Sequence, residues 1–333
     1  MKLLITGGAG YIGSHTVREL QRQGGYEVVV FDNLAYGHKE AVKDCPLVVG
    51  DLLDQQEIEK VFEQNKFAGV IHFAAYALAG ESMKEPAKYF KNNILGGLNL
   101  LEAMKNFGVK YIVFSSTCAI YGYPKKLPVG EEQEKKPVSV YGESKLAFEK
   151  ILGWYDQIYG IKNVSLRYFN ACGASLDGSI GEDHNPETHI IPVAMQAALG
   201  HREKFTIFGN DYNTPDRTCI RDYIQVIDLA RAHLKALEYL FSGNKSNYFN
   251  VGTGKGYSNK EILEMIKKIS GVNFPVEIGA RRPGDPDAIY ADNSKIKKIL
   301  NWEPKYSDLK TIIKTAWNWH KSHPNGYAGS FKV

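Results

Sequence analysis

The 333-residue sequence has little of what marks several common classes of protein. Its four cysteines, Cys45, Cys118, Cys172 and Cys219, are far apart and form no Cys-x-x-Cys pair. We therefore expect neither a disulfide framework nor a zinc site, predict no bound metal, and place the chain in a reducing compartment. No apolar run reaches the roughly 20 residues of a membrane span, and residues 1–5 are too short for a signal-peptide core.

Excess charge of one sign is also lacking. The formal net charge is +4, without a long run of like charge. A nucleic-acid-binding protein would carry a clustered basic stripe, so no nucleic-acid partner is expected. These absences predict a cytoplasmic protein that binds neither nucleic acid nor membrane, and the length allows one large domain or two lobes.

Short apolar runs alternate with amphipathic stretches through the first half of the chain. They predict strands at residues 3–6, 28–32, 47–51, 70–74, 111–115 and 164–168, and helices at 14–23, 55–64, 86–107 and 141–159. Such alternation indicates right-handed βαβ crossovers and a Rossmann-type, doubly wound parallel sheet.

After Asn170 this rhythm ends. Residues 171–185 are rich in Gly, Asp and Ser and predict a loop, and residues 249–252 predict a later strand. We expect an α/β protein with a dinucleotide-binding domain over residues 1–170. A smaller α/β substrate-binding lobe would follow over residues 171–333, with some of its segments returning to the first sheet.

The first strand leads directly into a glycine-rich turn. Gly7, Gly10 and Gly13 follow a Gly-x-x-Gly-x-x-Gly spacing where a strand meets a helix. Without Cβ atoms the backbone can turn tightly and approach phosphate oxygens, and the helix N-terminus offers free N–H groups. The pattern favours a dinucleotide pyrophosphate site over a purely structural turn.

Acidic residues end the next two strands. Asp32 lies 19 residues after Gly13, where a carboxylate accepts hydrogen bonds from a ribose diol and repels a 2′-phosphate, so NAD is favoured over NADP. Asp51 is placed to meet the adenine edge. The alternative for Asp51 is an N-cap of the helix that begins near Leu53.

A candidate base occurs far downstream. Tyr141 and Lys145 are four residues apart and share one helix face, so a lysine charge near the phenol would favour phenolate. They follow Ser115, Ser116 and Thr117, one of which could hydrogen-bond a reacting oxygen; the alternative is a turn or cap. A dinucleotide that takes hydride and a base that takes a proton predict redox chemistry at a hydroxyl carbon.

Taken together, these segments resemble the extended short-chain dehydrogenase/reductase family over nearly the whole chain. The matching segments are TGGAGYIGSH (6–15), HFAA (72–75), GES (80–82), YFKNN (89–93), SST (115–117), YGESK (141–145), RYFN (167–170), RDY (221–223) and RPGD (282–285). They are most similar to those of members that epimerise UDP-hexoses at C4. The resemblance implies interconversion of UDP-glucose and UDP-galactose through a 4-keto sugar, with tightly bound NAD and a homodimer built on helices 86–107 and 141–159.

The resemblance also implies roles for individual residues. Thr117 would be the hydroxyl partner of the base Tyr141, with Lys145 as the third catalytic residue. Cofactor contacts are expected from the glycines and acids named above and from Tyr11, Ile12, Asn33, Leu52, Phe73, Ala74, Ala75, Asn92, Ser115, Tyr141, Lys145 and Tyr168. Substrate contacts are expected from Thr117, Tyr141, Asn170, His189, Arg221, Arg282, Asp285 and Ile289. The arginines suit a diphosphate and Asp285 a ribose diol. The alternative for Arg221 is an ion pair with Asp222, and that for Ile289 is a core position in a short strand over residues 288–291.

Four positions depart from the family pattern. Ala77 stands where some members have a lysine near the cofactor, and His189 where several have asparagine beside the diphosphate. Arg217 and Gln225 replace a frequent glycine and histidine. These differences leave the reaction type intact and leave the substrate preference open, including whether N-acetylated or pentose sugars are accepted.

Other functions on the same fold are weaker candidates. Dehydratases that resemble this family place Asp-Glu directly after the Ser/Thr, whereas this chain has Cys118 and Ala119. A decarboxylase shares the fold, the cofactor and the Tyr/Lys pair. A non-catalytic NAD sensor or scaffold would be expected to lose the tyrosine or the lysine, and both are present here.

Overall fold

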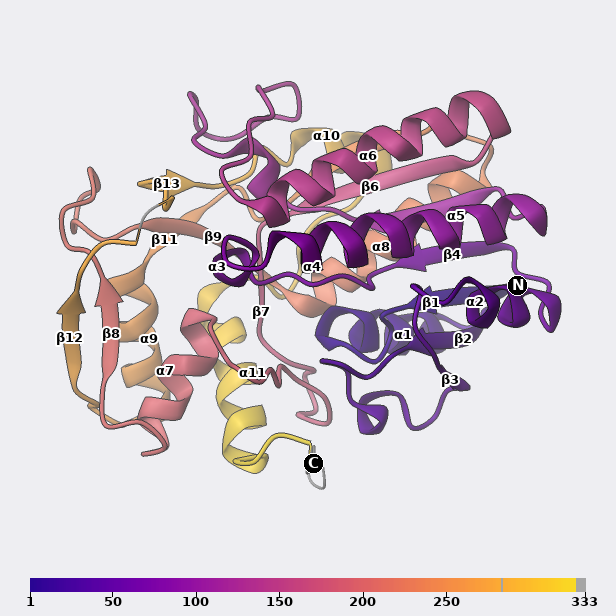
Figure 1. The fold of residues 1–333 in the computed structure, drawn as a ribbon. Coiled ribbons are helices and arrows are strands. Elements are labelled where there is room, and N and C mark those ends of the chain that lie inside the picture. Colours follow the sequence, from indigo (N-terminus) through magenta and orange to yellow (C-terminus); the bar gives the residue numbers. More distant parts are fainter. Residues whose placement is uncertain (283, 328–333) are drawn as a thin grey trace.

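A seven-stranded parallel sheet forms the centre of the molecule (Figure 1). The computed structural model describes residues 1–282 and 284–327. The sheet order is β10-β6-β5-β4-β1-β2-β3. Its strands are β1 (Lys2–Thr6), β2 (Glu27–Asp32), β3 (Leu47–Val49), β4 (Gly69–His72), β5 (Tyr111–Ser115), β6 (Lys162–Tyr168) and β10 (Asn247–Val251). The six strands expected in the first half and the strand at 249–252 are confirmed, with shifts of one to two residues at most ends.

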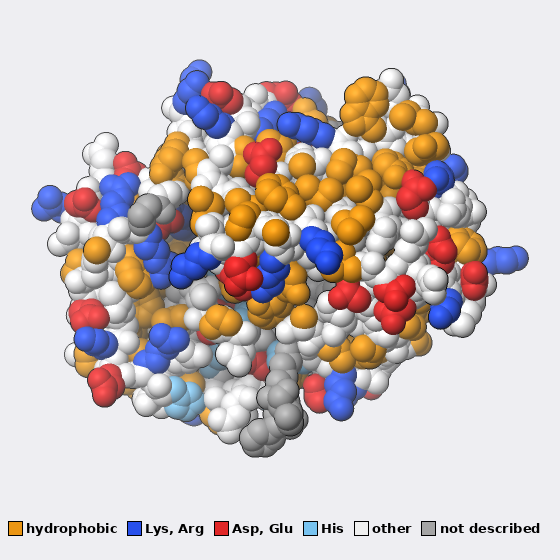
Figure 2. Space-filling model, in the orientation of Figure 1, with side chains coloured by type: hydrophobic (Ala, Val, Ile, Leu, Met, Phe, Trp, Pro, Cys, Tyr) orange, Lys and Arg blue, Asp and Glu red, His pale blue; other side chains and the backbone are white. Residues whose placement is uncertain are grey.

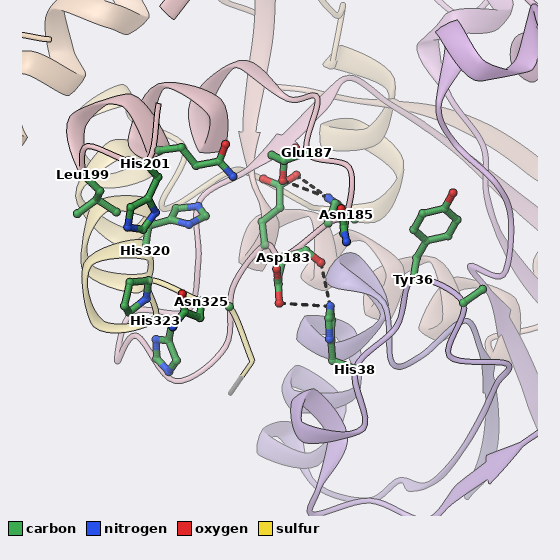
Figure 3. Close-up of a pocket in the computed structure, with 16 residues that line it drawn as sticks. Tyr36, His38, Asp183, Asn185, Glu187, Leu199, His201, His320, His323 and Asn325 are labelled. Carbon is green, nitrogen blue, oxygen red and sulfur yellow. Dashed lines mark hydrogen bonds and ion pairs between the residues drawn. The ribbon is translucent and has the colours of Figure 1, made fainter. Parts of the chain in front are cut away.

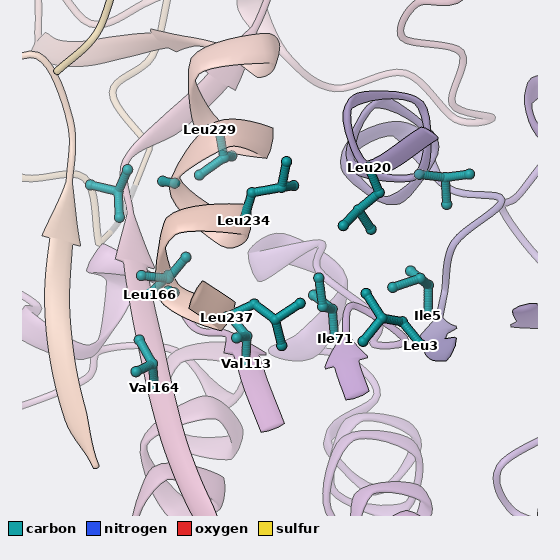
Figure 4. Close-up of a cluster of buried hydrophobic side chains, with 14 of the residues drawn as sticks. Leu3, Ile5, Leu20, Ile71, Val113, Val164, Leu166, Leu229, Leu234 and Leu237 are labelled. Carbon is teal, nitrogen blue, oxygen red and sulfur yellow. The ribbon is translucent and has the colours of Figure 1, made fainter. Parts of the chain in front are cut away.

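Helices cover both faces of this sheet because successive strand residues point to opposite sides. Leu3 and Ile5 lie on the face covered by α1 (Tyr11–Gln23), α8 (Val226–Phe241) and α10 (Ser294–Leu300), whereas Leu4 lies on the face covered by α2 (Gln55–Glu63), α5 (Gly96–Asn106) and α6 (Val140–Tyr159). Figure 4 shows α8 beside α1 on the first face, with Leu229, Leu234 and Leu237 against the strands. Strand β10 and helix α8 come from the second half of the chain and complete the first sheet.

The helix predicted over residues 86–107 is divided. The chain forms α3 (Ala79–Ser82) and α4 (Pro86–Phe90), then a π-helical turn (Lys91–Leu95), and continues as α5. The inserted residue changes which side chains face inward, and π-turns of this kind are frequent at functional sites. Two short 3₁₀ turns, Lys39–Val42 and Cys118–Tyr121, follow the second and fifth strands.

The remaining elements form a smaller layer beside the carboxyl ends of the sheet strands. Strand β9 (Ile220–Gln225) pairs with β7 (Asn170–Cys172), β11 (Gly256–Ser258) and β13 (Ala288–Ile289), and β8 (Phe205–Phe208) pairs with β12 (Val276–Gly279). Helices α7 (Ile190–Ala198), α9 (Asn259–Ser270) and α11 (Leu309–Ser322) pack together in a separate apolar core. The predicted loop over 171–185 thus begins inside β7.

Within the described ranges, none of the helices combines the length and the apolar character needed to cross a lipid bilayer. The cytoplasmic location and the domain boundary at residue 170 stay predictions. Pro283, part of the 282–285 motif, and residues 328–333 lie outside the described residues.

Candidate active site

One cavity of about 950 Å³ lies between the carboxyl ends of the sheet strands and the smaller layer. Its lining includes every residue predicted from the sequence to contact cofactor or substrate, from Gly7 to Ile289. The glycine turn, the strand-end acids, the Tyr/Lys pair and the late arginines therefore meet in one place. A crevice at the carboxyl ends of an open α/β sheet is where this architecture binds ligands.

The glycines serve two different purposes. Gly7 has a φ of 69°, and a Cβ there would lie 2.4 Å from the Ala74 backbone nitrogen. A Cβ on Gly13 would lie 2.3 Å from the Gly7 carbonyl oxygen, whereas one on Gly10 would meet nothing closer than 3.3 Å. Gly7 and Gly13 thus permit close packing of the turn. Gly10 precedes α1, whose first N–H groups lack intrahelical partners and suit an anion.

Asp32 is held in a fixed orientation at the end of β2. One carboxylate oxygen accepts the Ala9 N–H at 2.9 Å and the other accepts the Leu34 N–H at 2.8 Å. Asp51 accepts from the Asn33 side-chain amide at 3.1 Å and from the Leu53 N–H at 2.8 Å. Together with the glycine turn, these acids fit the ribose and phosphate chemistry of a dinucleotide.

The alternative role for Asp51, an N-cap, is wrong. The cap of α2 is Asp54, whose carboxylate accepts from the N–H groups of Gln56 and Glu57. Asp51 instead closes a turn onto Leu53 and stays on the cavity wall. Asp51 and Asp54 are both residue types that suit an N-cap. The start of the helix at Gln55 decides that Asp54 is the cap.

Tyr141 and Lys145 lie in the first turns of α6, which begins at a well-defined cap. Ser139 accepts the Gly142 N–H at 3.1 Å, and the Tyr141 N–H donates to the hydroxyl of Ser82 at 3.1 Å. The Lys145 ammonium donates to the Ser115 carbonyl at 2.7 Å and is only 3% exposed. Lys145 is therefore fixed to the end of β5, and the backbone of Tyr141 is fixed to α3.

The pKa values of this pair differ from the sequence-based expectation. Burial raises the pKa of Tyr141 above its ordinary value, and a hydrogen bond with Thr117 only partly opposes the rise. Burial also lowers the pKa of Lys145 to about 7, against the opposing charge of Glu149. Burial thus opposes the charged form of each group, and favours the protonated phenol and the neutral amine.

The three hydroxyls after β5 have different partners. Ser115 is hydrogen-bonded to the Tyr168 phenol, and Ser116 donates to Glu149 at 2.5 Å, outside the cavity. Thr117 caps the 3₁₀ turn by accepting the Ala119 N–H at 3.1 Å, and it is also hydrogen-bonded to Tyr141. Of these three residues, Ser115 and Thr117 line the cavity. Thr117 therefore caps the 3₁₀ turn and also belongs to the cavity wall.

Behind this row lies a buried ion pair. The Arg167 guanidinium donates to both oxygens of Glu149, at 2.6 and 3.0 Å, and the two side chains are 3% and 9% exposed. Glu149 is one helical turn after Lys145 on α6. The pair joins α6 to β6 directly behind the candidate catalytic residues.

The expected substrate residues gather at the other end of the cavity. Arg221 donates to the Pro286 carbonyl at 2.8 Å and lies 3.4 Å from Asp285, so the alternative pairing with Asp222 is wrong. Strand alternation turns Asp222 away, toward the N–H groups of Thr253, Gly254 and Ala291. Arg282 lies over the ring of Phe208, 3.8 Å from its centroid.

Two asparagines and Ile289 complete the wall. Asn92 lies in the π-helical turn and donates to Asn93 at 3.0 Å, and Asn170 donates to the Asp222 carbonyl at 3.0 Å. Ile289 is 5% exposed in β13, packs in an apolar cluster with Ile120 and Phe169, and also lines the cavity. The core position and the pocket position proposed for Ile289 are therefore compatible.

The departures from the family pattern have distinct structural settings. Arg217 has a φ of 65°, a conformation that favours the glycine frequent at this position in the family. Gln225 caps α8 and donates to the Ala174 carbonyl at 2.7 Å, away from the cavity. Ala77 and His189 both line the cavity. His189 lies 2.7 Å from Glu182 and 3.3 Å from Glu187.

Sequence reasoning missed several residues of the site. Ser82 orients the start of α6, and the buried Asn93 joins the Tyr76 backbone to the Ser144 hydroxyl. Glu182 and His184 line the cavity beside His189. The available signal for these last residues was the Glu-x-His-x-x-Glu-x-His spacing of residues 182–189.

Comparison with known proteins agrees with this geometry. Residues 3–252 match the NAD dependent epimerase/dehydratase family. The UDP-glucose 4-epimerase of Streptococcus mutans is 53% identical over 98% of this chain and 99% of its own length. The crystal structure of the Brucella ovis UDP-glucose 4-epimerase in complex with NAD is 48% identical, with a TM-score of 0.92 over 95% of this chain and 97% of its own.

A third relative is described by a broader activity. The UDP-Glc/GlcNAc 4-epimerase of Campylobacter jejuni is 45% identical, with a TM-score of 0.84 over 96% of this chain and 99% of its own. The resemblance inferred from the motifs is thus confirmed. This chain belongs to the NAD dependent epimerase/dehydratase family, within the extended short-chain dehydrogenases/reductases.

Proposed function

We propose that this chain interconverts UDP-glucose and UDP-galactose by epimerisation at C4. The observation that carries the proposal is the meeting of Tyr141, Thr117 and Lys145 with Arg221 and Asp285 in one cavity. A hydroxyl base at one end and diphosphate and ribose partners at the other fit a nucleotide sugar. The full-length identity to UDP-glucose 4-epimerases supports the same reaction.

Tyr141 removes the proton of the sugar 4-hydroxyl, and Thr117 orients the phenol through their hydrogen bond. Bound NAD supplies the reversible hydride acceptor for C4, so it is regenerated in each turnover. Lys145 holds positive charge beside the cofactor site. Because burial alone raises the pKa of Tyr141, the positive charge at this end of the cavity has to offset that rise for phenolate to form.

The cofactor is held by the carboxyl edge of the sheet. Gly10 and the first turn of α1 face the pyrophosphate, and Asp32 accepts the adenosine ribose hydroxyls. The remaining contacts are assigned to Tyr11, Ile12, Asn33, Asp51, Leu52, Phe73, Ala74, Ala75, Asn92, Ser115 and Tyr168, all of which line the cavity. The carboxylate of Asp32 excludes a 2′-phosphate.

The nucleotide half of the substrate is bound more firmly than the sugar. Arg221 and Arg282 meet the diphosphate and Asp285 meets the uridine ribose, and Asn170 contacts the substrate. The sugar itself meets Ile289, which offers no hydrogen bond. A 4-keto sugar held only through its diphosphate can turn and present its other face, which epimerisation requires.

The competing dehydratase reaction lacks its acid and base here. The side chain after Thr117 is Cys118, and burial raises the pKa of its thiol to about 12, so it stays protonated. The next residue, Ala119, has no titratable group. Neither can remove or deliver the proton that elimination of water needs.

A homodimer is the assembly we propose. Exposed apolar side chains gather on α4, the π-helical turn and α6, and they include Phe90, Leu95, Trp154 and Ile158 at 39–62% exposure. Figure 2 shows hydrophobic side chains across this face, over the helices labelled in Figure 1. Patches of this kind mark association sites, and a two-fold axis would bring the same helices of two copies together.

The direct experiment is product analysis. The purified chain is incubated separately with UDP-galactose and with UDP-N-acetylgalactosamine, and the products are separated by chromatography. Formation of UDP-glucose until both hexoses reach a constant ratio supports the proposal. Elimination or decarboxylation products, or unchanged substrate with NAD bound, would contradict it.

A further inference from the structure

The loop between β7 and α7 gathers two carboxylates and two imidazoles, of which only His189 was expected to contact the substrate. One ligand atom from each of Glu182, His184, Glu187 and His189 lies within 4.8 Å of the others. Figure 3 shows Glu187 on one side of the neighbouring pocket and His201, His320 and His323 grouped on the other. The other histidines of that pocket are not among the four grouped donors.

The contacts inside this cluster are short, but two key atoms lack a hydrogen bond. Glu182 Oε1 lies 2.7 Å from His189 Nδ1 and 3.3 Å from His184 Nδ1. Yet Glu182 Oε1 and His184 Nδ1 are both buried and have no hydrogen-bond partner. The Glu182 side chain is only 4% exposed, so water does not satisfy it.

Backbone N–H groups fix the orientation of the Glu187 carboxylate. Its Oε1 accepts the N–H groups of Thr188 and His189, at 2.7 and 2.8 Å, and lies 3.3 Å from His189 Nδ1. Its Oε2 lies 3.6 Å from His184 Nδ1. Outer contacts of this kind commonly orient the ligands of a metal ion.

The spacing and chemistry of the four donors suit a single ion. Zinc takes imidazole nitrogen and carboxylate oxygen at about 2.0–2.2 Å, and four such donors around a tetrahedral ion lie about 3.4 Å from one another. The N–O separations here are 2.7 to 3.6 Å. We propose that Glu182, His184, Glu187 and His189 bind one divalent transition-metal ion of the zinc class. The prediction of no metal followed from the cysteines, and these ligands contain no sulfur.

The ion would stabilise one wall of the active-site cavity. The Trp319 indole donates to the Glu182 carbonyl at 3.0 Å, and the ring of Tyr11 meets His184 edge-on at 6.1 Å. Tyr11 also donates to the Gly173 carbonyl at 2.7 Å. The bound loop would thus connect the glycine turn, the start of α7 and the last helix. With His189 engaged by the ion, the diphosphate is left to the two arginines.

The test measures metal binding by the full-length chain, apart from its activity. Protein prepared without a metal-affinity step is stripped with a chelator, dialysed, and titrated with Zn²⁺ alone and with Co²⁺ alone. We expect about one equivalent of either ion and a visible Co²⁺ spectrum of the four-coordinate type. Zn²⁺ should also raise the thermal midpoint, since it binds only the folded chain.

Matched variants locate the site. His184→Asn and Glu182→Gln should each weaken Zn²⁺ binding at least tenfold, whereas His201→Asn, an exposed histidine of the same pocket, should bind as the wild type does. No uptake of Zn²⁺ by the stripped wild type, or a Co²⁺ spectrum of the six-coordinate aqueous type, would overturn the proposal. So would tight binding that survives both ligand variants. If a ligand variant fails to fold, the wild-type titration and spectrum decide.

Discussion

Neutralising Glu149 should destabilise the fold strongly and also change the pH dependence of the enzyme. Glu149→Gln leaves the guanidinium of Arg167 buried without its counter-charge. The partners are 3% and 9% exposed, so solvent screens little of the loss. Breaking a buried pair by removing one partner typically costs about 3–5 kcal/mol. With an unfolding entropy of about 2.1 cal/mol/K per residue, a chain of this size would lose roughly 4–7 °C in Tm.

The same substitution should act on Lys145. Burial lowers the pKa of the Lys145 ammonium to about 7, and the carboxylate charge of Glu149 opposes that shift. Removing the carboxylate charge therefore lowers the pKa of Lys145 further. If the protonated lysine is the active form, activity is lost as pH rises through this pKa, and the alkaline decline of kcat/KM should move to lower pH in the variant.

Thermal and urea unfolding under saturating NAD would measure the first effect, and a pH profile of kcat/KM the second. Glu143→Gln, an exposed glutamate on the same helix, is the matched control and should cost less than about 0.5 kcal/mol. Combining Glu149→Gln with Arg167→Met should recover about half of the loss. The recovery is partial because Arg167 also donates to Tyr121 and to the Glu131 carbonyl.

Two results would refute this reasoning. The first is a Glu149→Gln variant whose Tm lies within about 2 °C of the wild type, since the pair would then contribute little. The second is a double variant that is less stable than the single one, which would mean that Arg167 is stabilised mainly by its other partners. An unchanged pH profile of kcat/KM would mean that the charge of Glu149 does not influence the pKa of Lys145.

Four further predictions concern the ligands and the catalytic residues. NAD should co-purify and NADP should bind far more weakly, because Asp32 occupies the place of a 2′-phosphate; denaturing the protein and identifying the released nucleotide measures this. Tyr141→Phe should keep folding and NAD binding nearly intact but lower turnover roughly 10²–10⁴-fold, since the base is lost. Lys145→Ala should also be severe, because it removes charge beside the phenol. Ile289→Tyr should reduce epimerisation of UDP-N-acetylglucosamine far more than that of UDP-glucose, because the ring would occupy the space of the acetamide.

Three outcomes would contradict this set of predictions. Release of mainly NADP would exclude the role given to Asp32. Near-normal turnover of the Tyr141→Phe variant would mean that another group is the base. Equal losses on both sugars in the Ile289→Tyr variant would place that side chain outside the sugar pocket.

The local sequence pattern predicts a strand or helix correctly where a single hydrophobic pattern runs through the whole element. The strand at 111–115 was predicted with its observed bounds, because a continuous apolar run ends there at three hydroxyl residues. The helix at 86–107 was predicted unbroken, since its composition alone does not reveal the π-helical turn. That turn places Asn92 on the cavity wall and Asn93 between Tyr76 and Ser144, and these are tertiary contacts.

Partners between distant segments could not be predicted in the same way. Arg221 and Asp222 are adjacent in sequence, yet strand alternation turns them to opposite sides, and Arg221 meets Asp285, which lies 64 residues away. The different partners of Ser116 and Thr117 are also set by tertiary structure. Their hydroxyls are alike in sequence, and only the approach of α6 directs one to Glu149 and the other to Tyr141.

The placement of β10 at the edge of the first sheet has a consequence for synthesis on the ribosome. Strand β6 ends at Tyr168, but its neighbour β10 begins only at Asn247, and α8, which covers the same face, begins at Val226. An emerging chain therefore exposes one edge of β6 and the apolar face beneath α8 until about three-quarters of it has been made. Long-range pairings of this kind slow folding and leave a nascent chain open to aggregation. We expect a stalled nascent chain of which only about the first 200 residues have left the ribosome to depend on chaperones, and one from which residue 251 has also emerged to be released from them.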